Sequence, residues 1–217
     1  MNILRPDNLA FPNLQTANRE GLLALGGDLS VARLLLAYRS GIFPWTDEPL
    51  TWWSPDPRAI FELERFRPPK RLEPKLRNNP FTITFDHAFA EVIHACAEPA
   101  PGRESTWISL RFIEAYVELH RQGHAHSVEV WLDDKLVGGV YGVAINGFFA
   151  GESMFHRVTD ASKIALCRLF DHLRERQFEL FDTQVLSPLT ARLGAIEIRR
   201  RDYLERLASA LRKPVRF

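Results

Sequence analysis

The sequence predicts an α+β protein in which a small N-terminal domain precedes a larger domain of helices packed on a mixed sheet. The composition changes near residue 80, because ten of the 14 prolines lie at or before Pro80 and three of the five tryptophans lie within residues 45–53. Beyond that point, helical and strand-like hydrophobic periods follow one another. We place the domain boundary between residues 1–62 and 63–217, a length that allows a sizeable core.

One helix is predicted in the N-terminal part, over residues 31–40. Ser30 is its expected N-cap and Gly41 its expected end. The residues around this helix are rich in proline and turn formers, which is typical of a small module with little regular structure. A basic connection broken by prolines, residues 65–77, leads to the larger domain.

The larger domain shows a clear succession of hydrophobic patterns. A hairpin signal, Asn146–Gly147, joins two of its strands, and Thr159 or Asp160 is expected to cap the helix that follows. The predicted elements are a strand at 81–85, helices at 87–97 and 109–123, strands at 126–132, 136–145 and 148–155, a helix from about 161, a strand at 178–185, a short helix at 187–194, a strand at 195–199 and a helix at 202–211.

Bulk composition excludes several classes of protein. The formal net charge is +1, so nucleic-acid binding would need a local patch rather than a general basic field. Cys96 and Cys167 lie far apart and are interpreted as buried thiols in a reducing cytosol. No segment resembles a signal peptide or a membrane span, which favours a cytoplasmic protein. No metal site is predicted, because no carboxylate or thiolate completes a set with the histidines near residue 124.

Glu152 is the first candidate functional residue, because it interrupts the apolar run "NGFFAGESMF". On a regular strand it shares a face with Phe148 and Met154, whereas Phe149 and Ser153 lie opposite. Two interpretations stay open. The carboxylate lines a largely apolar cavity, or it reaches solvent at a strand edge, as most glutamates do.

Asp182 and Gln184 are the second candidates, since residues i and i+2 of a strand project from one face. They end a strand that follows a crossover helix, and ligands often lie beyond such strand ends. A carboxylate with an amide beside it can accept a proton and orient a nucleophile. A turn-capping aspartate beside a solvated glutamine is the plainer alternative.

The tryptophans are open to two interpretations as well, a small core or exposed platforms for stacking bases.

Several long strings occur in an order that resembles the leucyl/phenylalanyl-tRNA protein transferase family. They include "REGLLALGGDLSVARLLLAYRSGIFPW", "WWSPDPRAIF", "GHAHSVEVW", "LVGGVYGVA", "GESMF" and "DTQ". The resemblance extends from about residue 10 to about residue 205. It implies an acetyltransferase-like (GNAT-type) fold for the larger domain and chemistry without a metal or small-molecule cofactor.

The resemblance also implies a reaction. Leucine or phenylalanine, with methionine as a further candidate, passes from aminoacyl-tRNA to the α-amine of a protein that begins with Lys or Arg. The product is marked for N-degron (N-end rule) degradation. The step is aminolysis of an ester, and an α-amine with a pKa of about 7.7–8.0 is partly neutral at cellular pH. The enzyme then needs to position the amine, remove one proton and stabilise the oxyanion.

By resemblance, Asp182 and Gln184 match the catalytic pair of the family. Asp182 is expected to accept or relay the proton and Gln184 to orient the amine, with pure positioning as the alternative. Glu152, Ser153 and Met154 are expected in the pocket for the aminoacyl side chain. The other pocket positions are Val140, Phe149, Leu166, Leu169 and Leu173. A bend or bulge at Gly151 is needed if Phe149 and Glu152 are to line one pocket.

Contacts with tRNA are expected at two places. Trp45 and Trp107 match tryptophans that contact the 3′-terminal adenosine. Charge clustering alone suggests acceptor-stem phosphates as partners of the basic connection, and a solvated linker is the rival interpretation. The residues concerned are Lys70, Arg71, Lys75 and Arg77. The sequence departs from the family at Leu189, commonly histidine, and at Val140, where a longer side chain can occur.

Two other functions are compatible with parts of the sequence. An acyl-CoA-dependent N-acetyltransferase shares the implied fold, but the turn "FHRVTDASK" has no glycine with which to build a pyrophosphate nest. A non-catalytic RNA-binding module would explain the tryptophans and the basic connection. It would not explain a carboxylate and an Asp-x-Gln pair beside an apolar pocket. A monomer is expected, because no sustained heptad pattern is present.

Overall fold

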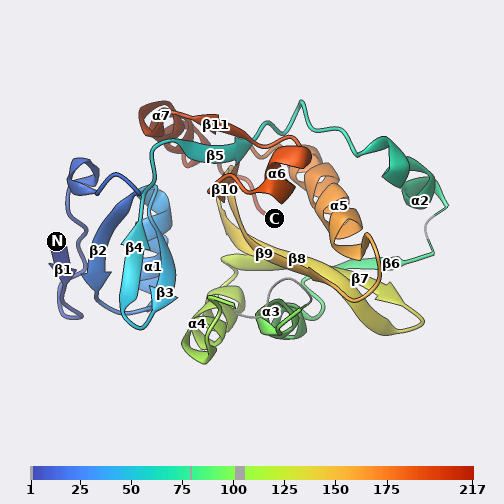
Figure 1. Cartoon of the computed structure of the whole chain (residues 1–217), viewed down its shortest axis with the longest axis horizontal. Helices are drawn as coiled ribbons and strands as arrows, with labels where there is room; N and C mark the ends of the chain where they lie inside the picture. Colours follow the sequence, from blue (N-terminus) through green and yellow to red (C-terminus); the bar gives the residue numbers. More distant parts are fainter. Residues whose placement is uncertain (1, 79, 101–105) are drawn as a thin grey trace.

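The computed structural model describes residues 2–78, 80–100 and 106–217 and contains two β-sheets (Figure 1). The N-terminal sheet has four strands and carries the helix α1 (Val31–Arg39), and a 3₁₀ turn at Leu14–Thr16 lies between its first two strands in the sequence. Their order is β1 (Asn2–Leu4), β2 (Leu22–Gly26), β4 (Leu50–Trp53) and β3 (Phe43–Asp47).

The predicted helix of the N-terminal part is confirmed, with its cap and its end. Ser30 Oγ accepts a hydrogen bond from the Arg33 backbone N–H, and Gly41 follows the helix at φ +75°. The four strands were not predicted, because they are short and β3 contains Pro44. Trp52 is fully buried among them, so this ring belongs to a small core rather than to a stacking surface.

The larger sheet has seven strands. Within the described residues, β9 and β10 run parallel and the other neighbouring pairs run antiparallel. The order is β11 (Ile196–Ile198), β5 (Arg58–Phe61), β10 (Leu180–Gln184), β9 (Phe148–His156), β8 (Lys135–Ile145), β7 (Ala125–Leu132) and β6 (Thr82–Phe85). Strand β5 comes from the N-terminal third of the chain, and the boundary proposed at residue 62 stays a prediction.

Helices cover both faces of this sheet (Figure 1). One face carries α5 (Ala161–Glu175), and the other carries α3 (Phe89–Ala97) and α4 (Leu110–Arg121). A 3₁₀ turn (Lys70–Leu72) leads to α2 (Glu73–Arg77), whereas α6 (Pro188–Arg192) and α7 (Arg200–Ala210) lie near β10 and β11. The predicted α+β class, a mixed sheet with flanking helices, is confirmed. None of the helices in the described ranges is long and apolar enough to cross a membrane.

A bulge in β9 changes which residues share a face. Tyr141 of β8 pairs with Ser153 and Gly142 pairs with Gly151, so Glu152 is the extra residue. The expectation that Met154 shares a face with Glu152 is therefore wrong. Met154 packs on the α5 side of the sheet, whereas the Glu152 carboxylate points to the side of α1 and α4.

The start of α5 also differs from the prediction. Asp160 is the N-cap residue, but its side chain makes no capping hydrogen bond. Its φ is +71°, and its carboxylate accepts hydrogen bonds from Lys75 Nζ at 2.8 Å and Lys163 Nζ at 2.9 Å. These two bonds lower the pKa of Asp160 to about 2. Two ammonium groups have thus drawn the carboxylate away from the helix end.

Candidate active site

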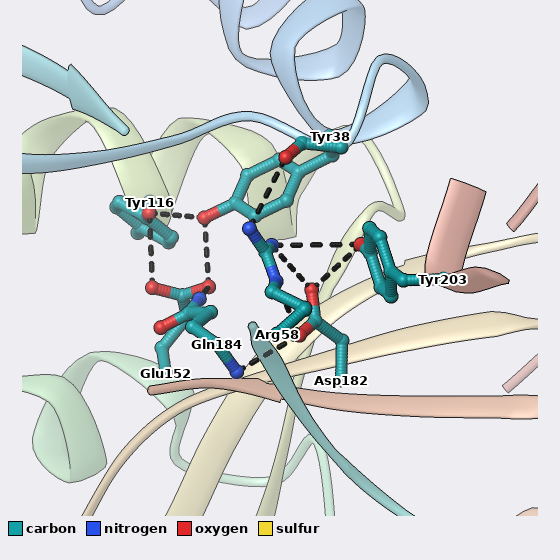
Figure 2. Close-up of polar contacts among 8 residues, drawn as sticks. Tyr38, Arg58, Tyr116, Glu152, Asp182, Gln184 and Tyr203 are labelled. Carbon is teal, nitrogen blue, oxygen red and sulfur yellow. Dashed lines mark hydrogen bonds and ion pairs between the residues drawn. The ribbon is translucent and has the colours of Figure 1, made fainter. Parts of the chain in front are cut away.

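Two carboxylates on neighbouring strands, Asp182 and Glu152, form the centre of the candidate site (Figure 2). Gln184 links them. Its backbone N–H donates to Asp182 Oδ1 at 2.8 Å, and its side-chain Nε2 donates to Glu152 Oε1 at 2.8 Å. The structure therefore brings together three of the residues that the sequence singled out.

Asp182 is fully buried and accepts four hydrogen bonds. Arg58 of β5 donates from Nε to Oδ1 at 2.9 Å and from Nη2 to Oδ2 at 2.6 Å. Tyr203 of α7 donates to Oδ2 at 2.8 Å, and the Gln184 N–H provides the fourth bond. The guanidinium of Arg58 lies over the ring of Phe43, 4.7 Å from its centroid. A bidentate pair of this kind fixes the orientation of the carboxylate.

Gln184 owes its position to an irregular end of β10. Asp182 pairs with Ile60 and Gln184 pairs with Ala59, so Thr183 is an extra residue in the ladder. Gln184 has φ +66°, a left-handed conformation that costs a non-glycine residue about 1–3 kcal/mol. The four bonds of Asp182 hold this bend in place, and the bend directs the amide of Gln184 toward Glu152.

Glu152 lies in a polar cluster between the sheet and two helices. Tyr38 of α1 donates to Oε1 at 2.8 Å, and Tyr116 of α4 donates to Oε2 at 3.3 Å. The two phenol hydroxyls also contact each other. Glu152 as a residue is partly exposed, but its carboxylate lies among hydroxyl and amide groups, so it neither lines an apolar cavity nor extends freely into solvent.

The surroundings favour the protonated form of Glu152. Burial, together with the negative charge of Asp182, raises the pKa of this carboxyl to about 7, although the bonds from Tyr38, Gln184 and Tyr116 oppose the shift. All of the hydrogen-bond partners of Glu152 in the described part of the chain are neutral groups. A carboxyl with a pKa near neutrality is suited to exchange a proton during a reaction.

The apolar residues expected in the aminoacyl pocket lie on the other side of the sheet from the Glu152 carboxylate. Val140 and Phe149 pack against α5, which contains Leu166, Leu169 and Leu173, and each of these residues is at most 5% exposed. The predicted bulge is present, but it places Phe149 and Met154 on one face and Glu152 on the other. Ser153 is partly exposed on the face of Glu152. The pocket assignment stays a prediction.

Comparison with known proteins decides the family. A family model described as leucyl/phenylalanyl-tRNA protein transferase matches residues 60–208, and the model of its N-terminal domain matches residues 27–56. The chain belongs to this family. A leucyl/phenylalanyl-tRNA protein transferase from Shewanella sp. (strain W3-18-1) is 50% identical over 219 residues, 99% of this chain and 93% of that protein. One from Syntrophobacter fumaroxidans is 52% identical over 205 residues, 93% and 88% of the two chains.

Two solved structures that this member of the transferase family resembles have low sequence identity to it. An aminoglycoside acetyltransferase from a soil metagenomic sample is 13% identical, with a TM-score of 0.40, and the match covers 62% of this chain and 88% of that one. A ribosomal-protein-alanine N-acetyltransferase from Brucella melitensis is 18% identical, with a TM-score of 0.33, over 45% and 74% of the two chains. Likeness at this level carries no conclusion about the site. The predicted enzyme class, a transferase, is confirmed by the family.

The two tryptophans expected to contact the 3′-terminal adenosine of the tRNA lie on neighbouring segments. Ser109 Oγ donates a hydrogen bond to the carboxylate of Asp47, which joins the end of β3 to the start of α4. Trp45 is 37% exposed, and its ring centroid is 5.1 Å from that of Trp53. Trp107 is partly buried. Their contact with a terminal adenosine stays a prediction.

The basic connection lies around α2, at the end of the molecule away from the N-terminal sheet (Figure 1). The four basic residues are all exposed: Lys70, Arg71, Lys75 and Arg77. Asp160 partly neutralises two of them, at 2.8 Å from Lys75 Nζ and 3.6 Å from Arg71 Nη2. A role in phosphate binding stays a prediction for this transferase. Leu189, at which the sequence was expected to depart from the family, is 38% exposed on α6.

Sequence reasoning missed four residues of the site: Tyr38, Arg58, Tyr116 and Tyr203. A usable signal existed for some of them. Arg58 opens the otherwise apolar strand "RAIF", and Tyr38 and Tyr116 occupy the apolar stripes of amphipathic helices. Polar groups at buried positions are rarely without a partner. Which partner they meet depends on contacts between residues far apart in the chain.

Proposed function

We propose that this transferase moves leucine or phenylalanine from aminoacyl-tRNA to the N-terminal α-amine of proteins that begin with Lys or Arg, which marks them for N-degron degradation. The names of the relatives support the donor and the class of acceptor. Methionine is a further candidate donor residue. The protein acts in the cytoplasm as a monomer in this proposal and needs no metal or small-molecule cofactor.

The observation that carries the proposal is the charge of the site. Arg58 neutralises Asp182, whereas Glu152 has tyrosine and glutamine partners and no hydrogen-bonded cation among the described residues. A partly buried carboxylate without a cationic partner favours a positively charged ligand. An acceptor that begins with Lys or Arg carries such charge on its side chain and, when protonated, on its α-amine.

Asp182 has a positioning role in this proposal. It holds the bend at Gln184, and the Gln184 amide oxygen is then free to accept a hydrogen bond from the incoming amine. The site of attack is the ester carbonyl of the aminoacyl-tRNA, and correct placement of the two reactants accounts for much of the rate in such reactions.

Transfer of labelled leucine tests the proposal. Leu-tRNA is mixed with peptides that begin with Arg, Lys, Ala or N-acetyl-Arg, using the wild type and Asp182→Ala. We expect label on the Arg and Lys peptides only. In the variant we expect the rate to fall by at least about 10²-fold, because Gln184 is no longer held in position without Asp182. Absence of label with the wild type, with Phe-tRNA tried as well, would refute the function. Equal labelling of the Ala peptide would refute the acceptor rule.

A further inference from the structure

We infer that Glu152, and not Asp182, takes up the proton that the acceptor amine loses when it attacks the ester. This inference rests on the proposed function, because it assigns one step of that reaction. Three features of the structure support it: all acceptor positions of Asp182 are used in hydrogen bonds, the contacts around Glu152 need one more hydrogen, and the two residues differ in exposure.

Asp182 has no place for another hydrogen. A carboxylate has about four lone-pair positions, and Asp182 uses four in bonds from Arg58, Tyr203 and Gln184. A proton on either oxygen would displace one of these bonds and leave a buried donor unpaired. Asp182 is also 0% exposed, so a substrate amine cannot reach it while the surrounding contacts persist.

The contacts around Glu152 call for one more hydrogen than the two tyrosines supply. Tyr38 and Tyr116 contact each other, Tyr38 contacts Oε1 and Tyr116 contacts Oε2, which makes a closed ring of three contacts. Burial raises the pKa of both phenols well above the usual value, so each keeps its one hydrogen at neutral pH. Two hydrogens can serve only two of the three contacts.

A proton on Oε2 of Glu152 completes the ring (Figure 2). Oε2 then donates to Tyr116, Tyr116 donates to Tyr38, and Tyr38 donates to Oε1. Each oxygen of the ring donates or accepts in turn, so the protonated form gains a hydrogen bond that the anion lacks. In the anion, the long 3.3 Å contact leaves Oε2 the more open oxygen of the carboxylate.

Gln184 places the reacting amine next to this open oxygen. Its Nε2 donates to Oε1 of Glu152, so its amide oxygen and Oε2 of Glu152 are the acceptors that stay available in the cluster. Titratable or charged groups face Glu152 from five elements: Tyr38 of α1, Arg58 of β5, Tyr116 of α4, Tyr141 of β8 and Asp182 of β10. Arg58 and Asp182 neutralise each other, and the three phenols stay neutral, so Glu152 is the group among them that changes charge near neutrality.

The step balances without a further reactant. The neutral α-amine forms a bond from nitrogen to the ester carbonyl carbon, and the nitrogen becomes cationic. Oε2 of Glu152 removes one proton from that nitrogen. The bond from the carbonyl carbon to the ribose oxygen then breaks, and the ribose oxygen takes the proton back from Glu152. The products are an amide and a free ribose hydroxyl, and Glu152 is again a carboxylate.

Two measurements test the inference. In protein labelled with ¹³C at the glutamate side-chain carboxyl, the Glu152 signal is identified by its loss in Glu152→Gln. We expect this signal to titrate with a midpoint of about 7. Single-turnover transfer of leucine to an Arg peptide is then followed from pH 5.5 to pH 9. We expect Glu152→Gln to lower the rate about 10²–10⁴-fold and to remove one of the two ionisations in the profile, the other being that of the acceptor amine.

Asp182→Asn is the matched control, because it also replaces a carboxylate by an amide. Its rate falls, but both ionisations remain, as expected when a residue only positions Gln184. A Glu152 midpoint below pH 5, or a Glu152→Gln variant that keeps both ionisations, would overturn the inference while leaving the proposed function intact. A wild type that transfers no leucine would instead refute the proposed function and this step with it, whatever the midpoint.

Discussion

Asp182 and Glu152 are two carboxylates that share one partner, Gln184, and both accept tyrosine hydroxyls, yet they differ in charge partner and in exposure. Asp182 meets a cation and is closed to solvent, whereas Glu152 meets two phenols and is partly exposed. The first arrangement holds an ion in a fixed geometry. The second lets a carboxyl gain or lose a proton near neutral pH.

This contrast shows how one cluster separates positioning from proton exchange. Two carboxylates with unlike environments are a common way for a protein to divide acid and base roles. Gln184 connects them, so a substitution next to Asp182 also moves the amide group that donates a hydrogen bond to Glu152. The contrast can be tested from either side.

The largest expected effect comes from removing the cation of Asp182. Arg58→Met leaves a buried carboxylate with no charge partner, and we expect the free energy of unfolding to fall by about 3–5 kcal/mol. Urea unfolding monitored by fluorescence measures it. The control is Arg201→Met, since Arg201 pairs with Glu205 at the surface and should change stability by less than about 0.5 kcal/mol. Equal losses of unfolding free energy in the two variants would show that the Arg58–Asp182 pair contributes no more to stability than a surface ion pair.

A smaller effect is expected from one hydrogen bond on the same side. Tyr203→Phe removes the 2.8 Å bond to Asp182 Oδ2, and we expect a loss of about 2 kcal/mol, because the acceptor is charged and buried. Tyr141→Phe is the matched control, because it also removes a buried tyrosine hydroxyl, but one with no hydrogen-bond partner within the described residues. Thermal melts should show little or no loss for Tyr141→Phe. A loss as large as that of Tyr203→Phe would contradict this account.

The smallest effect concerns the pH dependence of stability on the Glu152 side. The folded protein raises the pKa of Glu152 from 4.5 to about 7, so it binds this proton more tightly than the unfolded chain does. The contribution to stability is therefore present at low pH and is lost as the pH rises through this window. The Glu152→Gln variant has no carboxyl at this position, so it does not show this loss of stability. Its stability relative to the wild type should increase by about 1–2 kcal/mol between pH 5 and pH 8, and a constant difference would exclude the raised pKa.

Much of the larger domain could be predicted from local sequence. Alternation and helical periods located the elements beyond residue 80, because long amphipathic segments carry their own signal. The N-terminal sheet could not be predicted in this way. Its strands have three to five residues and depend on pairing between distant segments, such as β1 with β2.

The site was predictable in part, for a similar reason. Asp182, Gln184 and Glu152 stand out as polar residues in apolar strands, but the bulges at Glu152 and Thr183 change the direction of their side chains. A single extra residue inverts the alternation beyond it, and no local pattern marks it. Arg58 is adjacent to Asp182 only because β5 pairs with β10, across 124 residues of chain.

These long separations have a consequence for the order of events during synthesis. Tyr38 reaches Glu152 across 114 residues, and Tyr203 of α7 supplies a bond to Asp182. A growing chain cannot assemble the site before residue 203 has been added and has left the ribosome. An unfinished copy of this protein therefore lacks the complete Asp182–Glu152 cluster.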